Sequence, residues 1–371
     1  MKNLTRFKLN YQEIIFIVYV LYFTIMYIVP PISNILEHYS MIINFVVTIS
    51  LFILNIKQIS TKQILLVIIV ILNLIIGMLI NNTGFGSLIT LINIYLLFLY
   101  GDKTQIRQIG IRVVCCIVVI GEFVFSLVDK SIYNPNTIGY LYFIMTIFFY
   151  ILVAQEKKKN KVINLMTFII TAINIIFIYN SESRASLLGV FVFLIFLLFK
   201  IFTENRKIYK TVTFIVIIGT IIFPYIYIGM WNNGIEVDID NYSNKKFYSG
   251  RQVKWSLMVD DFKGKELYGL GSNYRFPGSS NLNVHNSLFA VYMIYGTINF
   301  IVFIIMFINF IWKMQRYCLN KTNRIATAGM IGIVIVSYYE SNIIWGSMFM
   351  YIIALSLIAM KRDEGDKKCV K

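Results

Sequence analysis

The feature that most constrains this chain is a series of long apolar runs, of which Ile64 to Ile80 is an example. A helix that crosses roughly 30 Å of hydrocarbon needs about 20 mostly apolar residues, because every backbone N–H and C=O must be satisfied within the segment. A strand barrel would instead show short segments of alternating hydrophobicity. Twelve segments qualify as helices, and they begin near Ile14, Met41, Gln63, Phe85, Ile109, Thr137, Val162, Ser186, Thr211, Ser287, Ile325 and Ile343.

Composition agrees with this pattern, since 58% of the 371 residues are hydrophobic and only 14% are charged. A soluble domain carries about a quarter charged residues, so a soluble protein is excluded. The sequence predicts an all-α, polytopic integral membrane protein with about twelve transmembrane helices, in one transmembrane domain over residues 1–371.

The net charge of +16 suggests a nucleic-acid partner in a soluble chain, but the positions of the charges exclude that interpretation here. With the N-terminus in the cytoplasm, twelve crossings return the C-terminus to the same side. Twenty-five of the 34 lysines and arginines then lie in cytoplasmic segments. This is the bias that the positive-inside rule describes, so both termini are predicted to be cytoplasmic.

No sequence motif indicates a cofactor or a metal site. The four cysteines lack metal spacing and form no disulfide framework, and there is no Walker or dinucleotide glycine loop. We therefore expect no cofactor, no metal and no nucleic-acid partner.

One large loop, residues 231–286, lies between the ninth and tenth predicted spans on the outer face. Loops of this length in compact folds are usually functional or disordered. A short helix is expected from near Ser249, which can cap it, with Arg251 and Trp255 on one face. Trp255 is expected at the level of the lipid headgroups.

Five short patterns follow one another on the predicted outer face: Asn134-Pro135-Asn136 with Gly139, Ser183-Arg184-Ala185-Ser186, Ser249-Gly250-Arg251 followed by Trp255, Gly269-Leu270-Gly271, and His285-Asn286-Ser287 with Gly296. In this order, with the large loop just before the histidine, the chain resembles the Wzy-type polysaccharide polymerase and O-antigen ligase family. The resemblance covers about residues 134–340, and that family often has an acid near the position of Glu340.

The resemblance implies a metal-independent glycosyltransferase of the bacterial plasma membrane, with its active site on the extracytoplasmic face. It implies an undecaprenyl-pyrophosphate-linked oligosaccharide as donor and as acceptor, polymerised into capsular polysaccharide, exopolysaccharide or O-antigen. Membrane lipids, a chain-length regulator and a flippase are the other partners that it suggests.

The chemistry of such a transfer suits three residues of these patterns. A departing lipid pyrophosphate gains negative charge, which the guanidinium groups of Arg184 and Arg251 are suited to bind. His285 could take the proton of the sugar hydroxyl, or it could instead donate a hydrogen bond to phosphate.

We assign His285, Arg184 and Arg251 as candidate catalytic residues. The candidate substrate-binding residues are Asn134, Asn136, Ser183, Ser186, Trp255, Gly271, Asn286 and Glu340.

Each assignment has a structural alternative. Arg184 could snorkel to the interface, Arg251 could form a surface pair with Asp260 or Asp261, and His285 could cap the next helix. Glu122 lies inside a predicted span and has no assignable partner. Lys245, Lys246 and Arg275 either line a path for an anionic substrate or are solvated surface charges.

Two other functions stay open at this point. A ligase would move finished glycan to a different acceptor by the same chemistry. A lipid-linked oligosaccharide flippase would also have about twelve spans, but it should carry charges in a central cavity and related sequence halves. The charged candidates here gather on one face, which favours an enzyme.

The predicted orientation can be tested by labelling. A cysteine placed at Ser249 or Asn281 should react with a membrane-impermeant thiol reagent in intact cells, because the large loop is expected outside. Protection of both positions would contradict the topology.

Overall fold

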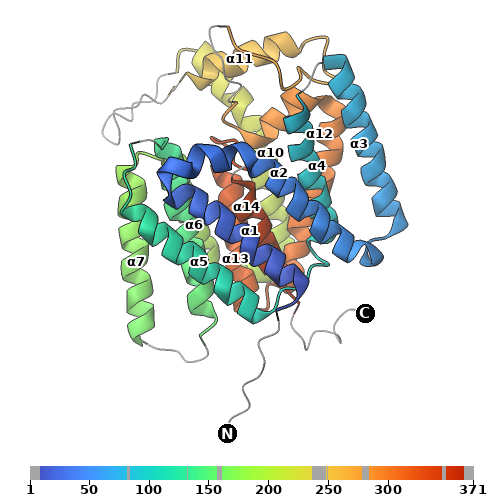
Figure 1. Cartoon of the computed structure of the whole chain (residues 1–371). Helices are drawn as coiled ribbons and strands as arrows, with labels where there is room; N and C mark the ends of the chain where they lie inside the picture. The colour runs from blue at the N-terminus through green and yellow to red at the C-terminus, as the bar shows by residue number, and fades with distance from the viewer. Residues whose placement is uncertain are drawn as a thin grey trace.

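The computed structural model describes residues 9–81, 84–131, 133–156, 161–235, 248, 250–277, 284–344 and 348–362, and the regular elements in these ranges are all helices (Figure 1). They are α1 (Tyr11–Ile28), α2 (Pro30–Asn55), α3 (Thr61–Asn81), α4 (Phe85–Tyr100), α5 (Gln108–Ser126), α6 (Pro135–Ala154), α7 (Lys161–Asn180), α8 (Arg184–Leu198), α9 (Ile201–Glu204), α10 (Arg206–Asn232), α11 (Arg251–Phe262), α12 (Ser287–Met314), α13 (Lys321–Val336) and α14 (Phe349–Ala359), with short 3₁₀ turns at Ile56–Gln58 and Gln315–Tyr317.

Each of the twelve predicted segments coincides with one of these helices, and ten of the helices begin within five residues of the predicted start. The second helix begins at Pro30 instead of near Met41, because proline suits the first helical position and the helix continues through the polar Glu37 and His38. The last helix begins at Phe349 rather than near Ile343. The side chain of Asn342 instead donates to the carbonyl of Ile333, which holds this stretch as a turn.

Eight helices in the described part of the chain are long and apolar enough to cross a membrane. Among the others, α4, α8 and α14 are apolar but shorter, and α13 has 16 residues. The structure therefore supports a polytopic membrane protein, while the number of twelve crossings remains a prediction.

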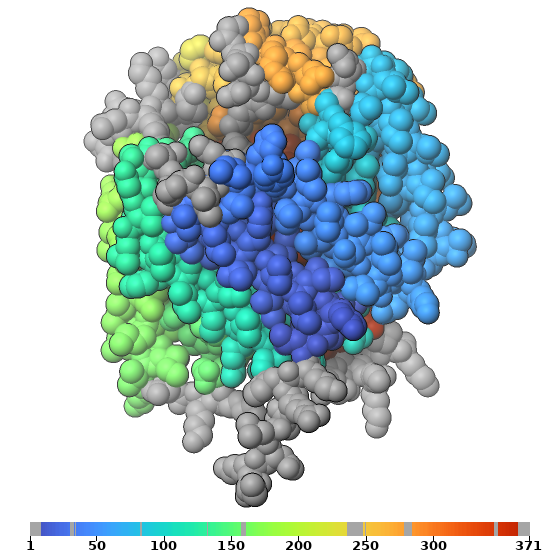
Figure 2. Space-filling view, viewed as in Figure 1, coloured from blue at the N-terminus to red at the C-terminus, as the bar shows by residue number. Residues whose placement is uncertain are grey.

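Large apolar side chains cover the outside of the bundle. On the peripheral helices α3 and α7, Leu79 is 75% exposed and Phe168 is 71% exposed. Figure 2 shows how much of one face is formed by α1, α2 and α3, in blue, beside the green helices of the middle of the chain. A contiguous apolar surface of this extent is unfavourable in water, so it indicates contact with lipid.

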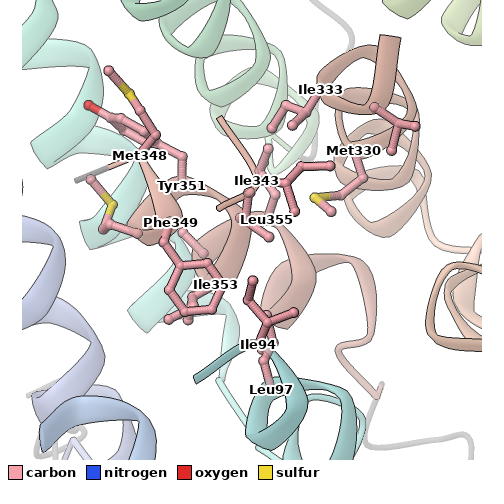
Figure 3. Packing of buried hydrophobic residues seen from close by; sticks show 14 of the residues in the cluster. Ile94, Leu97, Met330, Ile333, Ile343, Met348, Phe349, Tyr351, Ile353 and Leu355 are labelled. Atoms are coloured by element: carbon pink, nitrogen blue, oxygen red, sulfur yellow. The ribbon is translucent and has the colours of Figure 1, made fainter. Parts of the chain in front are cut away.

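The centre of the bundle is α14, whose eleven residues are all buried. A helix that is apolar on every side is expected in the interior. Figure 3 shows Leu355 of α14 beside Met330 of α13, and Ile353 of α14 above Ile94 of α4. The hydroxyl of Tyr351, also on α14, donates to Glu122 at 3.1 Å, which identifies a partner for the intramembrane acid.

Polar contacts sort the connections between helices onto two opposite ends of the bundle. At one end, the segments after α4, α9 and α12 meet the start of α13 and the end of α14, through ion pairs such as Lys313 with Asp102 and Arg324 with Glu204. At the other end, Asn81 donates to the carbonyl of Gly269 at 2.7 Å. Helix α11 lies across this second end (Figure 1).

The large loop is attached to α12 at a break in that helix. Gly296 has φ 75° there, and the freed carbonyls of Met293 and Ile294 accept from the backbone N–H groups of Leu270 and Gly271, at 2.7 and 3.0 Å. A Cβ on Gly296 would lie 2.4 Å from the carbonyl oxygen of Leu267. This position needs glycine for its conformation and for space.

Gly296→Ala should destabilise the folded protein by roughly 2–5 kcal/mol, because it combines a left-handed conformation with a backbone clash. Thermal unfolding of the purified protein in detergent measures the loss. Gly229→Ala is the matched control, since an added Cβ in α10 meets nothing within 4 Å. Equal unfolding temperatures for the two variants would contradict the role assigned to the break.

Candidate functional site

A cavity of about 710 Å³ opens at the end of the bundle where α11 lies. Three helices begin at it, namely α6, α8 and α11, and segments next to α12 and α13 complete it. Its lining consists of Asn134, Pro135, Asn136, Glu182, Arg184, Ala185, Leu187, Leu188, Phe191, Tyr227, Gly250, Arg251, Lys254, His285, Tyr339 and Glu340. The three candidate catalytic residues, which are far apart in the sequence, therefore share one cavity with Asn134, Asn136 and Glu340.

The cavity lining carries three cations, Arg184, Arg251 and Lys254, and two carboxylates, Glu182 and Glu340. Arg184 and Arg251 are the first residues of α8 and α11, and Lys254 lies one turn further along α11. The N-terminus of a helix carries partial positive charge, and three such ends face this cavity. An arginine at a helix start opposes the helix dipole at a cost of roughly 0.3–1 kcal/mol. Helices α7, α10 and α13 also begin with a basic residue, so what distinguishes Arg184 and Arg251 is that both line one cavity.

Glu340 links the starts of two helices to His285. Its Oε1 accepts from Nη2 of Arg251 at 2.9 Å and from Nδ2 of Asn136 at 2.7 Å. Its Oε2 lies 3.3 Å from Nδ1 of His285. The side chains of Arg251, Glu340 and His285 are 18%, 15% and 21% exposed, so they are held by the protein and still accessible to a ligand.

Backbone strain is concentrated at the same cavity. Among the residues that the structure describes, Glu182 and His285 are the non-glycine residues with positive φ, at 53° and 54°. Both line the cavity. Such conformations are uncommon outside glycine and often mark functional sites, because the surrounding structure must enforce them.

Tyr339 adds a neutral hydroxyl to the charged lining. Burial raises the pKa of Tyr339, and the charges of Arg251 and Arg184 oppose this effect only in part. The guanidinium of Arg251 also lies over its ring, 5.9 Å from the centroid. The hydroxyl therefore keeps its proton at neutral pH and can donate a hydrogen bond.

The cavity also has an apolar wall on α8. Leu187, Leu188 and Phe191 continue along α8 below Arg184, and Leu188 and Phe191 are 43% and 49% exposed at the surface of the bundle. A cationic end and a partly exposed apolar side together suit a ligand with an anionic head and a hydrocarbon tail.

Five candidate residues lie outside the lining and have structural contacts instead. Buried Ser183 donates to Ser186 at 2.9 Å under the start of α8. Asn286 caps α12 through the N–H of Phe289 and ties it to the carbonyl of Thr220 in α10. Gly271 belongs to the attachment of the loop to α12. The contact of Ser183 with Ser186 thus lies next to Arg184, and the contacts of Asn286 lie next to His285. The contact of Gly271 holds the large loop against α12.

Trp255 is the fifth, and its predicted place among the headgroups is wrong. Its side chain is fully buried, and its Nε1 donates to the carbonyl of Val284 at 2.6 Å. Phe223, Tyr227 and Phe289 surround the ring. Trp255 thus fixes α11, and with it Arg251, beside the residue that precedes His285.

The predicted helix in the large loop is confirmed as α11, but its first residue is Arg251 and its capping position is Gly250, with φ 82°. Ser249, the predicted cap, lies outside the described residues, as do Lys245 and Lys246. Arg275 is exposed and donates to the carbonyls of Ser272 and Tyr274. Arg251 pairs with Glu340 rather than with Asp260 or Asp261.

Sequence reasoning missed several cavity residues. Lys254 could have been found, because it lies three residues after Arg251 and therefore on the same helix face. Glu182 and Tyr339 each lie within two residues of a candidate. Tyr227 and the wall of α8 gave no signal, since apolar and aromatic residues fill every span.

No group of three His, Cys, Asp or Glu side chains in the described ranges is placed to hold a metal ion. Comparisons with protein-family models, with curated proteins and with solved structures found no match. The family resemblance therefore rests on the ordered motifs.

Inorganic pyrophosphate should bind in this cavity and raise the unfolding temperature of the wild-type protein in detergent, because a ligand of the folded state stabilises it. Arg184→Ala should abolish most of this increase. Lys263→Ala is the control, because it removes a cation of the large loop whose side chain is 74% exposed. This variant should show the same increase in unfolding temperature as the wild type. An equal increase in all three proteins would place the anion elsewhere.

Proposed function

We propose that this protein is an extracytoplasmic glycosyltransferase that polymerises undecaprenyl-pyrophosphate-linked oligosaccharide repeat units. The observation that carries the proposal is that Arg184, Arg251 and His285 line one cavity whose side wall is apolar and partly exposed. Such a cavity matches the two halves of the donor, a pyrophosphate and a polyprenyl tail. It also brings together the residues that the family resemblance implies.

The reaction assigns a role to each group. The oxygen of an acceptor sugar hydroxyl bonds to the anomeric carbon of the donor, while the bond from that carbon to pyrophosphate breaks. The electron pair stays on the pyrophosphate, where Arg184 and Arg251 balance the developing charge. The hydroxyl proton passes to His285, which makes the hydroxyl a competent nucleophile.

The orientation of the site follows from the charge distribution of the loops. The cavity lies at the end of the bundle opposite the contacts of Asp102 and Glu204, whose neighbouring segments are rich in lysine and arginine. By the positive-inside rule that basic end is cytoplasmic. The cavity is then outside, where lipid-linked repeat units are presented after they cross the membrane.

The direct test is reconstitution in lipid vesicles with a defined undecaprenyl-pyrophosphate repeat unit. We expect a ladder of products, and Arg184→Ala, Arg251→Ala and His285→Ala should each lower the rate by about 10²-fold or more, as is typical when one preorganised catalytic group is removed. Lys265→Ala, in the same large loop, is the matched control and should leave the ladder unchanged.

The products distinguish the alternatives. A single transfer to an added second acceptor, with no ladder, would identify a ligase. Movement of the lipid-linked unit between leaflets without a new glycosidic bond would identify a flippase. A ladder that persists in all three variants would exclude the assigned site.

A further inference from the structure

The carboxylate of Glu340 is placed to control the protonation of His285. An ionised carboxylate accepts hydrogen bonds and donates none. Arg251 and Asn136 both donate to Oε1, so Oε2 is the oxygen that faces Nδ1 of His285. The guanidinium of Arg251 is always charged and forms an ion pair with the carboxylate at 2.9 Å.

We propose that Glu340 is a positioning residue rather than a substrate-binding residue, and that it fixes the tautomer of His285 with the proton on Nδ1. Nε2 then carries the lone pair and is the atom that takes the proton of the sugar hydroxyl. This inference rests on the proposed function for its chemical consequence. The tautomer itself is a property of the protein without substrate.

The surroundings hold both partners in place. The peptide carbonyl of Glu340 accepts from the hydroxyl of Ser287 at 3.0 Å, two residues beyond His285. The same hydroxyl accepts from the N–H of Ile343 at 3.1 Å. Both ends of the His285 and Glu340 contact therefore lie next to the start of α12, where His285 has a left-handed backbone with φ 54°.

Replacing Glu340 by glutamine gives a sharp prediction, because the two donors also orient the amide. Arg251 and Asn136 require an acceptor, so the glutamine carbonyl oxygen takes the place of Oε1. Its NH₂ group then faces Nδ1 of His285 and donates to it. The imidazole must respond by moving its proton to Nε2, which is the wrong tautomer for a base at that atom.

The tautomer can be measured by ¹⁵N NMR of the histidine ring nitrogens at a pH where the imidazole is neutral. The chain has only two histidines, so His38→Gln in α2 leaves His285 as the sole signal. In that background we expect the Nδ1–H tautomer, and adding Glu340→Gln should invert it to Nε2–H. Glu340→Ala, which removes the Oε2 acceptor, should lower the share of the Nδ1–H form.

The same tautomer in the parent and in Glu340→Gln would overturn the proposal, and so would an Nε2–H form in the parent. An unfolding temperature near that of the parent verifies that the substitution preserves the fold. If Glu340→Gln fails that check, Glu340→Ala decides the question, since an unchanged single tautomer there would also overturn the proposal.

Kinetics separate this inference from the proposed function. In the reconstituted assay, Glu340→Gln should lower kcat at least tenfold, because Nε2 of His285 then carries the proton and cannot act as a base. KM for the lipid-linked donor should not rise, because Arg251 loses its counter-charge and keeps its affinity for pyrophosphate. A higher KM with unchanged kcat would make Glu340 a substrate-binding residue. Glu340→Gln could invert the tautomer of His285 although the parent protein transfers no glycan. That result would refute the proposed function and leave the positioning role of Glu340 standing.

Discussion

The candidate site depends on one carboxylate. Glu340 accepts from the start of α6 through Asn136 and from the start of α11 through Arg251, and it lies beside His285 just before α12. These segments are separated by large stretches of sequence, and the contacts with Glu340 hold them at fixed positions. Charge-assisted hydrogen bonds of this kind are stronger than neutral ones, so the cavity is preorganised rather than assembled by its ligand.

Several local rules of protein structure are broken at this cavity. Arg184 and Arg251 occupy helix starts where an acidic residue would be more stable, and neither α8 nor α11 has a side-chain cap. Glu182 and His285 adopt left-handed backbone conformations. Asn10, Asn205 and Asn320 cap other helices, but α4 and α5 also lack a side-chain cap, so the left-handed backbone is the conflict that distinguishes this cavity. Local conflicts that gather in one place are expected at functional sites.

The helices could be predicted from sequence because the bilayer imposes a simple requirement, namely long apolar segments. The errors are informative: the polar Glu37 and His38 hid the first half of α2, and the contacts of Asn342 shortened α14.

The site was predictable only in part. Arg184, Arg251 and His285 stood out as polar residues in patterned loops, but the contact of Asn136 with Glu340 joins residues 204 positions apart and leaves no local pattern. Burial of Trp255 likewise depends on Phe223 and Phe289, which look like any other apolar residues of a span.

The central claim is that a lipid pyrophosphate binds with its head between Arg184 and Arg251 and its tail along α8. An electron cryo-microscopy structure of the protein with bound undecaprenyl pyrophosphate tests this claim most directly. The account predicts phosphate density within hydrogen-bonding distance of both guanidinium groups and tail density against Leu188 and Phe191. Phosphate density at the opposite end of the bundle, or a tail bound away from α8, would contradict it.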